Sequence, residues 1–242
     1  MNLILITVDC LRADHLSCLG YSKQTTPNLD NLARGSVLFT QAISVGSGTI
    51  TSFKAMFTST YPLMHDGKLY ITDLTTTLAQ VLREHGYHTA AFHTNPWISK
   101  LYGYDKGFDT FDDGIRKWRF DSLMSKPKAL AERIIGMSGR LHEFLSIIYT
   151  TFLTSSYITK AEVLNKKAIS WLADNPNNFF LWIHYMDAHQ PYVPASRLAS
   201  PLKTYRIVGL DTKARYSPGS LSLQEVNKLI DAYDASLSYI DN

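Results

Sequence analysis

Three segments of the chain place polar side chains directly after a predicted strand, where open α/β sheets bind their ligands. The first contains Asp9, which follows the apolar run 2–8. A carboxylate there is costly unless it is paired, solvated or bound to a cation. An isolated aspartate at a strand end more often forms a turn or caps a helix. Asp9 is therefore a candidate metal ligand, with the structural role as its alternative.

The second segment is a glycine-rich turn that ends in Thr49, at the predicted start of a helix. A threonine in this place is commonly a plain N-cap. The same place favours an alkoxide, because the helix dipole and free backbone N–H groups stabilise negative charge there. A nearby metal would lower the pKa of the hydroxyl further. Thr49 is therefore a candidate nucleophile, and the capping role stays open.

The third segment contains Asp187 and His189, which follow the apolar run 179–185 and precede Pro191 and Pro194. One histidine alone indicates little. A His-containing loop that two prolines stiffen, at the carboxyl end of a strand, favours contact with an anion. Asp187 and His189 are therefore candidate substrate contacts.

The elements that must position these residues alternate short apolar runs with amphipathic helical patterns, as in a parallel sheet covered on both faces. We predict strands over 2–8, 36–45, 88–93 and 179–185, the first of them a buried central strand. Predicted helices begin at Thr26-Pro27 and end at Gly35, cover 75–85 and 160–173, and begin at the capping box Ser222 to Glu225. The predicted fold class is α/β, doubly wound, with a mostly parallel sheet. Residues 116–157 break this rhythm and are predicted to be a helical insertion.

Composition limits the classes of function. The chain has 242 residues with 45% hydrophobic content, enough for one sizeable core, and its net charge of +3 is too small to indicate nucleic acid. Its two cysteines, Cys10 and Cys18, form no disulfide framework and fit a reducing compartment. We find no secretory signal, and the uncharged stretch 144–158 is shorter than the roughly 20 apolar residues of a spanning helix. We therefore expect a cytoplasmic protein without a membrane partner.

Taken in order, the segments resemble the sulfatase family of the alkaline phosphatase superfamily. The matching stretches are Asp9-Cys-Leu-Arg-Ala-Asp-His15 with Gly20-Tyr21, Thr26-Pro-Asn-Leu-Asp30, Gly48-Thr-Ile-Thr-Ser52 with Met56-Phe-Thr-Ser-Thr-Tyr-Pro62, Leu78-Ala-Gln-Val-Leu82 with Gly86-Tyr87, Gly107-Phe-Asp-Thr-Phe111, Met186-Asp-Ala-His-Gln-Pro-Tyr192 and Tyr233 to Asp241. The resemblance implies an alkaline phosphatase-like fold, with residues 1–242 as the N-terminal portion of a catalytic domain.

The resemblance also implies roles for individual residues. Asp9 would bind a divalent metal, Thr49 would be both nucleophile and metal ligand, and His189 would contact the anionic oxygens of the ester. His93 and Asn95, after the third predicted strand, would contact substrate. The Thr49 alkoxide would then attack phosphorus or sulfur in line while the metal and His189 neutralise charge on the equatorial oxygens.

The chain departs from the family at the nucleophile. Sulfatases carry a Cys or Ser that is oxidised to formylglycine within a C/S-x-P-x-R pattern, whereas this chain has Thr49-Ile-Thr-Ser-Phe53. We therefore expect no formylglycine. A threonine nucleophile is the arrangement of the superfamily's phosphoesterases and phosphotransferases. Cys10 stands where many sulfatases have a second aspartate, and a buried packing role suits it better than ligation.

The family's later Asp-His or Asp-Asn metal pair is absent from the sequence, and the last predicted helix runs out at Asn242. We therefore expect a chain truncated at its C-terminus. Asp9 and Thr49 supply about two of the four or more ligands that such a metal needs, so metal binding should be weak and turnover small. Oxygen ligands favour calcium, magnesium or manganese over zinc.

The predicted function is metal-dependent hydrolysis of a sulfate or phosphate ester, with a small-molecule or glycan ester as substrate and no nucleic acid or membrane as partner. Two alternatives remain. One is a non-catalytic fragment or pseudoenzyme that binds an anionic glycan. The other is a phosphotransferase that acts on a cell-surface polymer. The sequence leaves the substrate, the choice of ester and the oligomeric state open.

Overall fold

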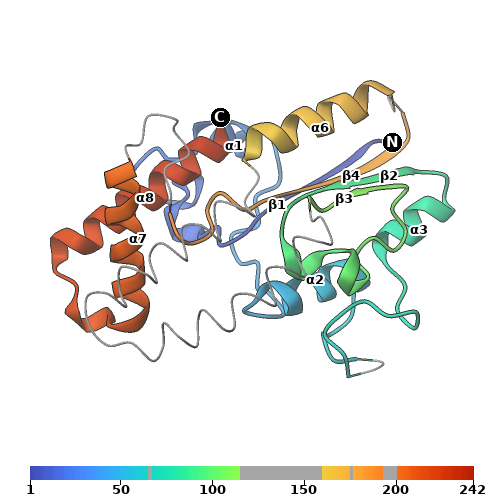
Figure 1. Cartoon of the computed structure of the whole chain (residues 1–242). Coiled ribbons are helices and arrows are strands. Elements are labelled where there is room, and N and C mark those ends of the chain that lie inside the picture. Colours follow the sequence, from blue (N-terminus) through green and yellow to red (C-terminus); the bar gives the residue numbers. More distant parts are fainter. Residues whose placement is uncertain (65–66, 115–159, 175–176, 193–200) are drawn as a thin grey trace. The chain divides into compact units, whose positions relative to one another are not determined.

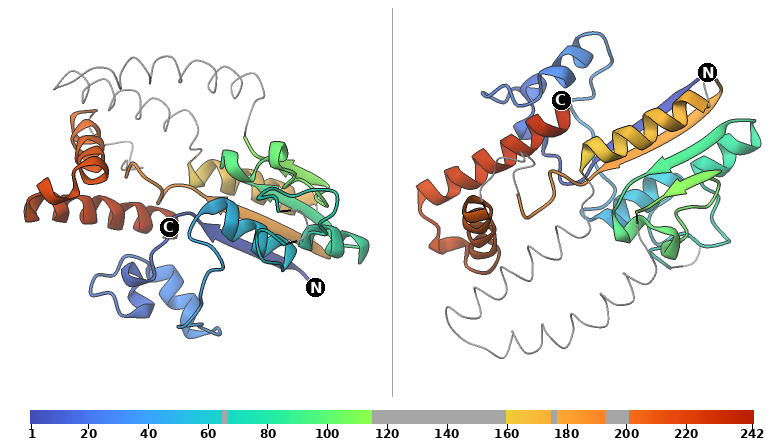
Figure 2. Two further views of the ribbon diagram at one scale, coloured as in Figure 1. Left: turned by 90° about the horizontal axis from the view of Figure 1, so that it is seen from below. Right: turned by 45° about the horizontal axis from the view of Figure 1, so that its top comes forward.

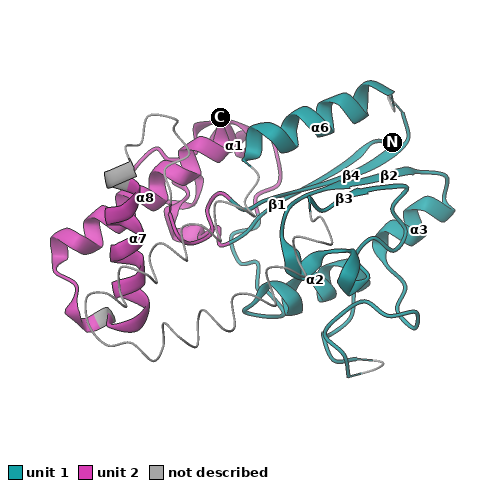
Figure 3. Cartoon of the chain, in the orientation of Figure 1, with its two compact units in different colours: residues 1–9, 39–115, 159–186 teal, residues 10–38, 116–158, 187–242 magenta. Residues whose placement is uncertain are grey.

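The structure is a computed structural model that describes residues 1–64, 67–114, 160–174, 177–192 and 201–242 (Figure 1). The side chains of 201–203 and 218 are not among those described. The chain divides into two compact units. Unit 1 comprises residues 1–9, 39–115 and 159–186, and unit 2 comprises the remainder (Figure 3). The predicted helical insertion 116–157 lies outside the described residues.

Unit 1 is built on a parallel sheet of four strands in the order β1-β4-β2-β3. The strands are β1 (Leu3–Val8), β2 (His88–Phe92), β3 (Thr110–Asp112) and β4 (Phe179–Tyr185). Three of the four predicted strands are therefore confirmed, as is their parallel arrangement. The short strand β3 was not predicted, because three residues are too few to show a pattern of their own.

Helices cover both faces of this sheet. The helices α2 (Thr49–Thr58) and α3 (Leu78–Glu84) lie on one face and α6 (Ala161–Asp174) lies on the other (Figure 2). An aromatic core joins these helices to the sheet. It includes Phe53 and Phe57 of α2, and Phe180 and Trp182 of β4. The predicted doubly wound α/β class is confirmed.

The prediction that residues 2–8 form a buried central strand is wrong for the part of the chain that the structure describes. β1 is an outer strand of the sheet order, with β4 as its neighbour. Leu3 and Leu5 pack against the core, whereas Ile4 and Ile6 on the opposite face are 55% and 58% exposed. A continuous apolar run indicates burial on both faces but cannot say which other segments provide it.

The prediction of a strand over 36–45 is also wrong. The segment has turns and bends but no strand, and Val37, Phe39 and Ile43 are 81%, 78% and 92% exposed. β-branched and aromatic residues favour strands only where a neighbouring strand offers pairing and packing. No described strand pairs with this segment.

Unit 2 contains α1 (Pro27–Arg34), α7 (Pro201–Tyr216) and α8 (Leu223–Asp241). The predicted capping box of α8 is present, since the Ser222 hydroxyl accepts from the Glu225 N–H and the Glu225 carboxylate accepts from the Ser222 N–H. At the other end of α8, the Asp241 carboxylate accepts the N–H groups of Asn28 and Leu29 at 2.7 and 2.9 Å. Asp241 therefore caps α1, whose N-terminus favours negative charge.

A buried carboxylate on α8 fixes the segment that precedes α1. Asp234, 7% exposed, accepts hydrogen bonds from Tyr21 at 2.9 Å and Lys23 at 2.8 Å and is paired with His15 at 2.7 Å. Burial alone would raise the pKa of Asp234, but the bonds from Lys23, His15 and Tyr21 outweigh it and hold the pKa below its usual value.

None of the described helices is long and apolar enough to cross a membrane.

Candidate active site

Asp9 lies at the carboxyl end of β1, where its backbone N–H donates to the Tyr185 carbonyl of β4 at 2.9 Å. This bond carries the parallel ladder one residue past β1 and fixes the direction of the Asp9 side chain. The side chain is only 10% exposed. A carboxylate that is so little exposed needs polar partners or a cation.

Thr49 supplies one of these partners. Gly48 is the N-cap of α2 and Thr49 is its first residue, so Thr49 is not the N-cap that the sequence left as an alternative. The Thr49 hydroxyl donates to Asp9 Oδ2, with 3.3 Å between the oxygens. The structure therefore brings together two side chains that are distant in sequence, and both carry the hard oxygen atoms that divalent cations prefer.

Glycine at position 46 allows this turn to approach α2. A Cβ on Gly46 would lie 2.1 Å from Thr51 Oγ1 and 2.5 Å from Thr51 Cβ. The Ser52 hydroxyl also donates to the Gly46 carbonyl at 2.6 Å. A side chain larger than that of glycine at position 46 would collide with Thr51, so the turn that precedes Thr49 requires glycine there.

Two further side chains reach Asp9 from the interior of unit 1. Asn95 Nδ2 donates to Asp9 Oδ2 at 2.8 Å, and His184 Nε2 lies 3.5 Å from the same oxygen. Asn95 is 1% exposed and His184 is fully buried. Asn95 Oδ1 also accepts the Trp97 N–H at 3.0 Å, at the start of the short 3-10 helix η3 (Pro96–Ile98). Asn95 is therefore held as a partner of Asp9, and its predicted substrate contact stays a prediction.

His93 follows β2 and is fully buried between Trp182 and Phe111. Its burial holds the pKa of His93 well below its usual value, and the nearby His184 lowers it further. The Asn95 N–H donates to His93 Nδ1 at 3.2 Å, so the proton of the neutral ring is on Nε2, which has no hydrogen-bond partner among the described residues. The His93 side chain has no exposed surface through which it could reach a substrate in this structure. A substrate contact by His93 stays a prediction.

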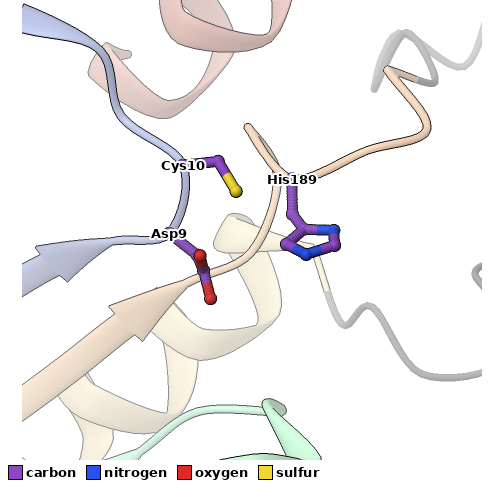
Figure 4. A group of neighbouring side chains, drawn as sticks. All are labelled: Asp9, Cys10 and His189. Atoms are coloured by element: carbon purple, nitrogen blue, oxygen red, sulfur yellow. The ribbon is translucent and has the colours of Figure 1, made fainter. Parts of the chain in front are cut away.

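Asp187 and His189 belong to unit 2, in the turn that follows β4. Both are partly buried, and His189 Nδ1 lies 2.7 Å from the Gln190 carbonyl oxygen. Within unit 2, a ring nitrogen of His189 and the Cys10 sulfur lie within 4.8 Å of each other (Figure 4). Cys10 is exposed rather than buried, so the packing role expected for it is wrong, and the thiol is a candidate ligand beside the imidazole.

The backbone around Cys10 is fixed from α8. The Tyr233 hydroxyl accepts the Arg12 N–H and donates to the Cys10 carbonyl, both at 2.8 Å. Burial raises the pKa of Tyr233 to about 12, which keeps this donor protonated. Cys10 itself has a left-handed backbone with φ of 57°. Residues 10–12 of unit 2 are thus held in one conformation.

Sequence reasoning missed Thr7 and His184 as neighbours of Asp9 in unit 1, and Tyr233 as the residue that holds residues 10–12 in unit 2. A signal for the first two was present, because each is the polar residue within an otherwise apolar strand. They face each other in the register of β1 and β4. No signal pointed to Tyr233, whose contact with residues 10–12 spans more than two hundred positions of sequence.

The fold and the placement of the site define a class of protein. It is a doubly wound α/β protein with polar side chains at the carboxyl ends of its parallel strands. A family model described as Sulfatase matches residues 1–242. The chain therefore belongs to the sulfatase family.

One curated relative is the N-acetylgalactosamine-6-O-sulfatase of Bacteroides thetaiotaomicron, which is 33% identical over 96 residues. That match covers 36% of this chain and 19% of the relative. The chain thus spans only a small part of this relative.

Solved structures share the fold. The phosphonate monoester hydrolase of Agrobacterium radiobacter has a TM-score of 0.61 at 18% identity, over 99% of this chain and 57% of that one. The C-terminal periplasmic domain of EcEptC from Escherichia coli, in complex with Zn, has a TM-score of 0.60 at 17% identity, over 99% and 56%. A protein of the alkaline phosphatase superfamily from Vibrio parahaemolyticus has a TM-score of 0.56 at 19% identity, over 99% and 49%. The chain has an alkaline phosphatase-like fold and spans about half the length of these structures.

Proposed function

We propose that this chain provides the nucleophile half of a metal-dependent hydrolase of phosphate or sulfate esters, with Thr49 as the nucleophile. The observation that carries the proposal is the contact between the Thr49 hydroxyl and Asp9 Oδ2 at the start of α2. The N-terminus of α2 supports negative charge on the Thr49 oxygen, through its dipole and its free N–H groups.

The residues around Thr49 favour an unmodified threonine over formylglycine chemistry. Phe53 stands where the family's sulfatases have a basic residue, and it is 7% exposed in the aromatic core against Trp182 and His184. An aromatic side chain cannot replace a cation beside a formylglycine. Thr49 as the direct nucleophile suits a phosphorus centre better than a sulfur centre for this chain.

A divalent cation fits the pair Asp9 and Thr49, because both present oxygen at a nearly buried position. Such a cation would lower the pKa of the Thr49 hydroxyl and neutralise charge on the ester. Thr49 Oγ1 loses its proton to solvent and forms a bond to phosphorus, while the bond to the leaving oxygen breaks and that oxygen takes a proton. Water then forms a new bond to phosphorus, the bond from phosphorus to Thr49 Oγ1 breaks, and Oγ1 takes back a proton as free phosphate leaves. Asp9 orients the hydroxyl and would hold the cation, and His189 is the proposed contact for the ester's anionic oxygens.

Two ligands are too few for tight binding of calcium, magnesium or manganese. Because the chain spans about half of its solved relatives, we infer that full activity depends on ligands beyond this pair. The 242-residue chain should therefore bind these ions weakly. The identity of the ion, a small-molecule or glycan ester as substrate and a cytoplasmic location all stay proposals.

A phosphotransferase is the second candidate. It is favoured by two structural relatives, the lipoteichoic acid synthase LtaP from Listeria monocytogenes and the soluble domain of lipooligosaccharide phosphoethanolamine transferase A from Neisseria meningitidis. The first half of the reaction would be the same, and an acceptor hydroxyl would replace water in the second half. The two functions differ only in what cleaves the phosphothreonine.

The test is calorimetric titration of the chain and of Asp9→Asn with manganese, calcium and zinc, followed by assays on aryl phosphate, phosphonate and sulfate esters. We expect weak manganese binding that Asp9→Asn abolishes, and slow release of the aryl group from phosphorus esters. Binding that is unchanged in Asp9→Asn would refute the site. Retained anion binding without any covalent step would favour a pseudoenzyme.

A further inference from the structure

Two polar side chains interrupt the apolar strands next to Asp9. Thr7 of β1 and His184 of β4 are direct neighbours in the parallel register. His184 is fully buried, with its ring edge against Phe53 at a centroid distance of 4.9 Å. A buried imidazole needs hydrogen-bond partners for both ring nitrogens, and those partners decide which nitrogen carries the proton.

The partner of His184 Nδ1 is Thr7, at 2.9 Å. The Thr7 hydroxyl also accepts from Trp182 Nε1 at 3.0 Å, and an indole can only donate. The hydroxyl proton is then free to go either to His184 Nδ1 or to the Ile183 carbonyl, which is more distant at 3.4 Å. The 2.9 Å contact between Thr7 and Nδ1 is made whichever of the two atoms donates. If the hydroxyl donates to Nδ1, the proton of a neutral His184 lies on Nε2.

His184 Nε2 faces the carboxylate of Asp9, with 3.5 Å to Oδ2. A carboxylate only accepts, so a lone pair on Nε2 would be repelled there while an N–H is attracted. The distance is long for a hydrogen bond, and the effect is that of a dipole aimed at the charge. Asn95 Nδ2, which can only donate, lies 2.8 Å from the same oxygen and 3.4 Å from His184 Nε2, and the second contact would need an unprotonated Nε2. The contact with Asp9 Oδ2 is the shorter of the two, so the amide hydrogen is directed to the carboxylate and leaves Nε2 to face the same charge. Two neighbouring donors thus converge on Asp9 Oδ2.

We propose that His184 is a positioning residue for Asp9, with its Nε2–H tautomer favoured by the charge of Asp9 and accommodated by the Thr7 hydroxyl. The inference rests on the proposed function, in which Asp9 holds the cation. His184 itself contacts neither cation nor ester. Side chains that orient a metal ligand typically change metal affinity by about 10- to 100-fold when they are removed.

Two substitutions that each replace the His184 imidazole by a carboxamide separate the positioning role from a purely structural one. The side-chain amide of glutamine reaches the place of imidazole Nε2, whereas that of asparagine reaches only the place of Nδ1. His184→Gln therefore keeps a donor toward Asp9, and His184→Asn keeps only the contact with Thr7. Both remove the ring from Phe53, so both should lower the melting temperature by similar amounts.

The experiment uses the 242-residue chain in three steps. Long-range ¹H–¹⁵N spectra report the tautomer of His184 without metal. Water-proton relaxation during titration with Mn²⁺ measures weak affinities for wild type, His184→Gln, His184→Asn and Asp9→Asn. Thermal melting of each variant measures the structural cost.

We expect the Nε2–H tautomer, Mn²⁺ affinity within about 3-fold of wild type for His184→Gln, and affinity about 10- to 100-fold weaker for His184→Asn. An Nδ1–H tautomer, or equal affinities for the two variants, would overturn the positioning role while leaving the proposed function intact. If the wild type binds no Mn²⁺ through Asp9, the proposed function fails and the inference fails with it.

Discussion

Replacing Thr49 by valine removes one hydroxyl from the site and almost nothing else. Threonine and valine have the same shape, so the change leaves no cavity at the start of α2. The lost interaction is the bond from Thr49 Oγ1 to Asp9 Oδ2 at 3.3 Å. Hydrogen bonds to charged groups contribute about 1.5–3 kcal/mol, and this distance is well above the usual 2.7–2.8 Å for two oxygens. We therefore expect a loss of about 1 kcal/mol, or about 2–4 °C in melting temperature.

The expected effect on chemistry is far larger than the effect on stability. Without the hydroxyl there is no atom to bond to phosphorus, and turnover should fall by at least about 10³-fold, which corresponds to about 4 kcal/mol in the barrier. The assay is acid quenching of the chain during reaction with 4-nitrophenyl phosphate and Mn²⁺, with the bound phosphoryl group located by mass spectrometry. Labelling should occur on Thr49 in the wild type, persist in Thr49→Ser and vanish in Thr49→Val.

Thr51→Val is the matched control. Thr51 lies in the same first turn of α2, and its hydroxyl donates to the Gly48 carbonyl at 3.0 Å on an exposed face. Its loss should cost a similar fraction of stability, about 0.5–1.5 kcal/mol, and leave labelling intact. Labelling of Thr49→Val at the wild-type level, or equal loss in Thr49→Val and Thr51→Val, would refute the assignment of Thr49.

Three further predictions concern the scaffold. The pKa of Asp234 is lowered in the fold, so its pairing stabilises the chain above the unfolded pKa of about 3.9, and this contribution is lost as pH falls through the lower folded pKa. Asp234→Asn should therefore cost about 2 kcal/mol at neutral pH and flatten the acid side of the stability profile measured by urea unfolding; an unchanged profile would contradict this. Gly46→Ala should destabilise by about 1–3 kcal/mol in the same assay, because a Cβ would overlap Thr51, and a neutral result would mean that α2 can shift freely. Ile183 is 7% exposed, and Ile183→Ala should lower the free energy of unfolding by about 2–5 kcal/mol. Ile6 is 58% exposed, and Ile6→Ala should lower it by well under about 1 kcal/mol. Equal losses would show that the exposed face of β1 is covered in solution.

The sequence was sufficient for elements whose pattern is local. Phe179 to Tyr185 is a run of apolar and aromatic residues, and β4 has these bounds with every one of its residues buried. Ser222 with Glu225 forms the predicted capping box that begins α8, whereas the box of Thr77 with Gln80 begins α3 inside the predicted range 75–85. In each case the side chain and backbone groups that define the boundary lie within a few residues of each other.

The sequence was insufficient where the deciding partner is distant in the chain. Residues 36–45 have the composition of a strand, but composition cannot show whether a neighbouring strand is present. The same limit applies to the hydrogen bond from Asn95 to Asp9, which the sequence did not predict, whereas the substrate contact that the resemblance implied for Asn95 stays a prediction. The sequence alone does not distinguish an asparagine that contacts a ligand from one that orients a carboxylate.

The partners of Asp9 differ in how firmly the fold holds them. Asn95 and His184 reach Asp9 Oδ2 from the buried interior, and both are held there by further hydrogen bonds, so they are fixed before any ligand arrives. Thr49 reaches the same oxygen from the start of α2 through the longest of the hydrogen bonds to it. A cation at Asp9 would compete with the Thr49 hydrogen bond more readily than with the Asn95 hydrogen bond, because the first is 3.3 Å long and made by a partly exposed side chain, whereas the second is 2.8 Å long and buried. We therefore expect Asp9 to keep its orientation when the hydroxyl is released to react, which is the behaviour that a preorganised site requires.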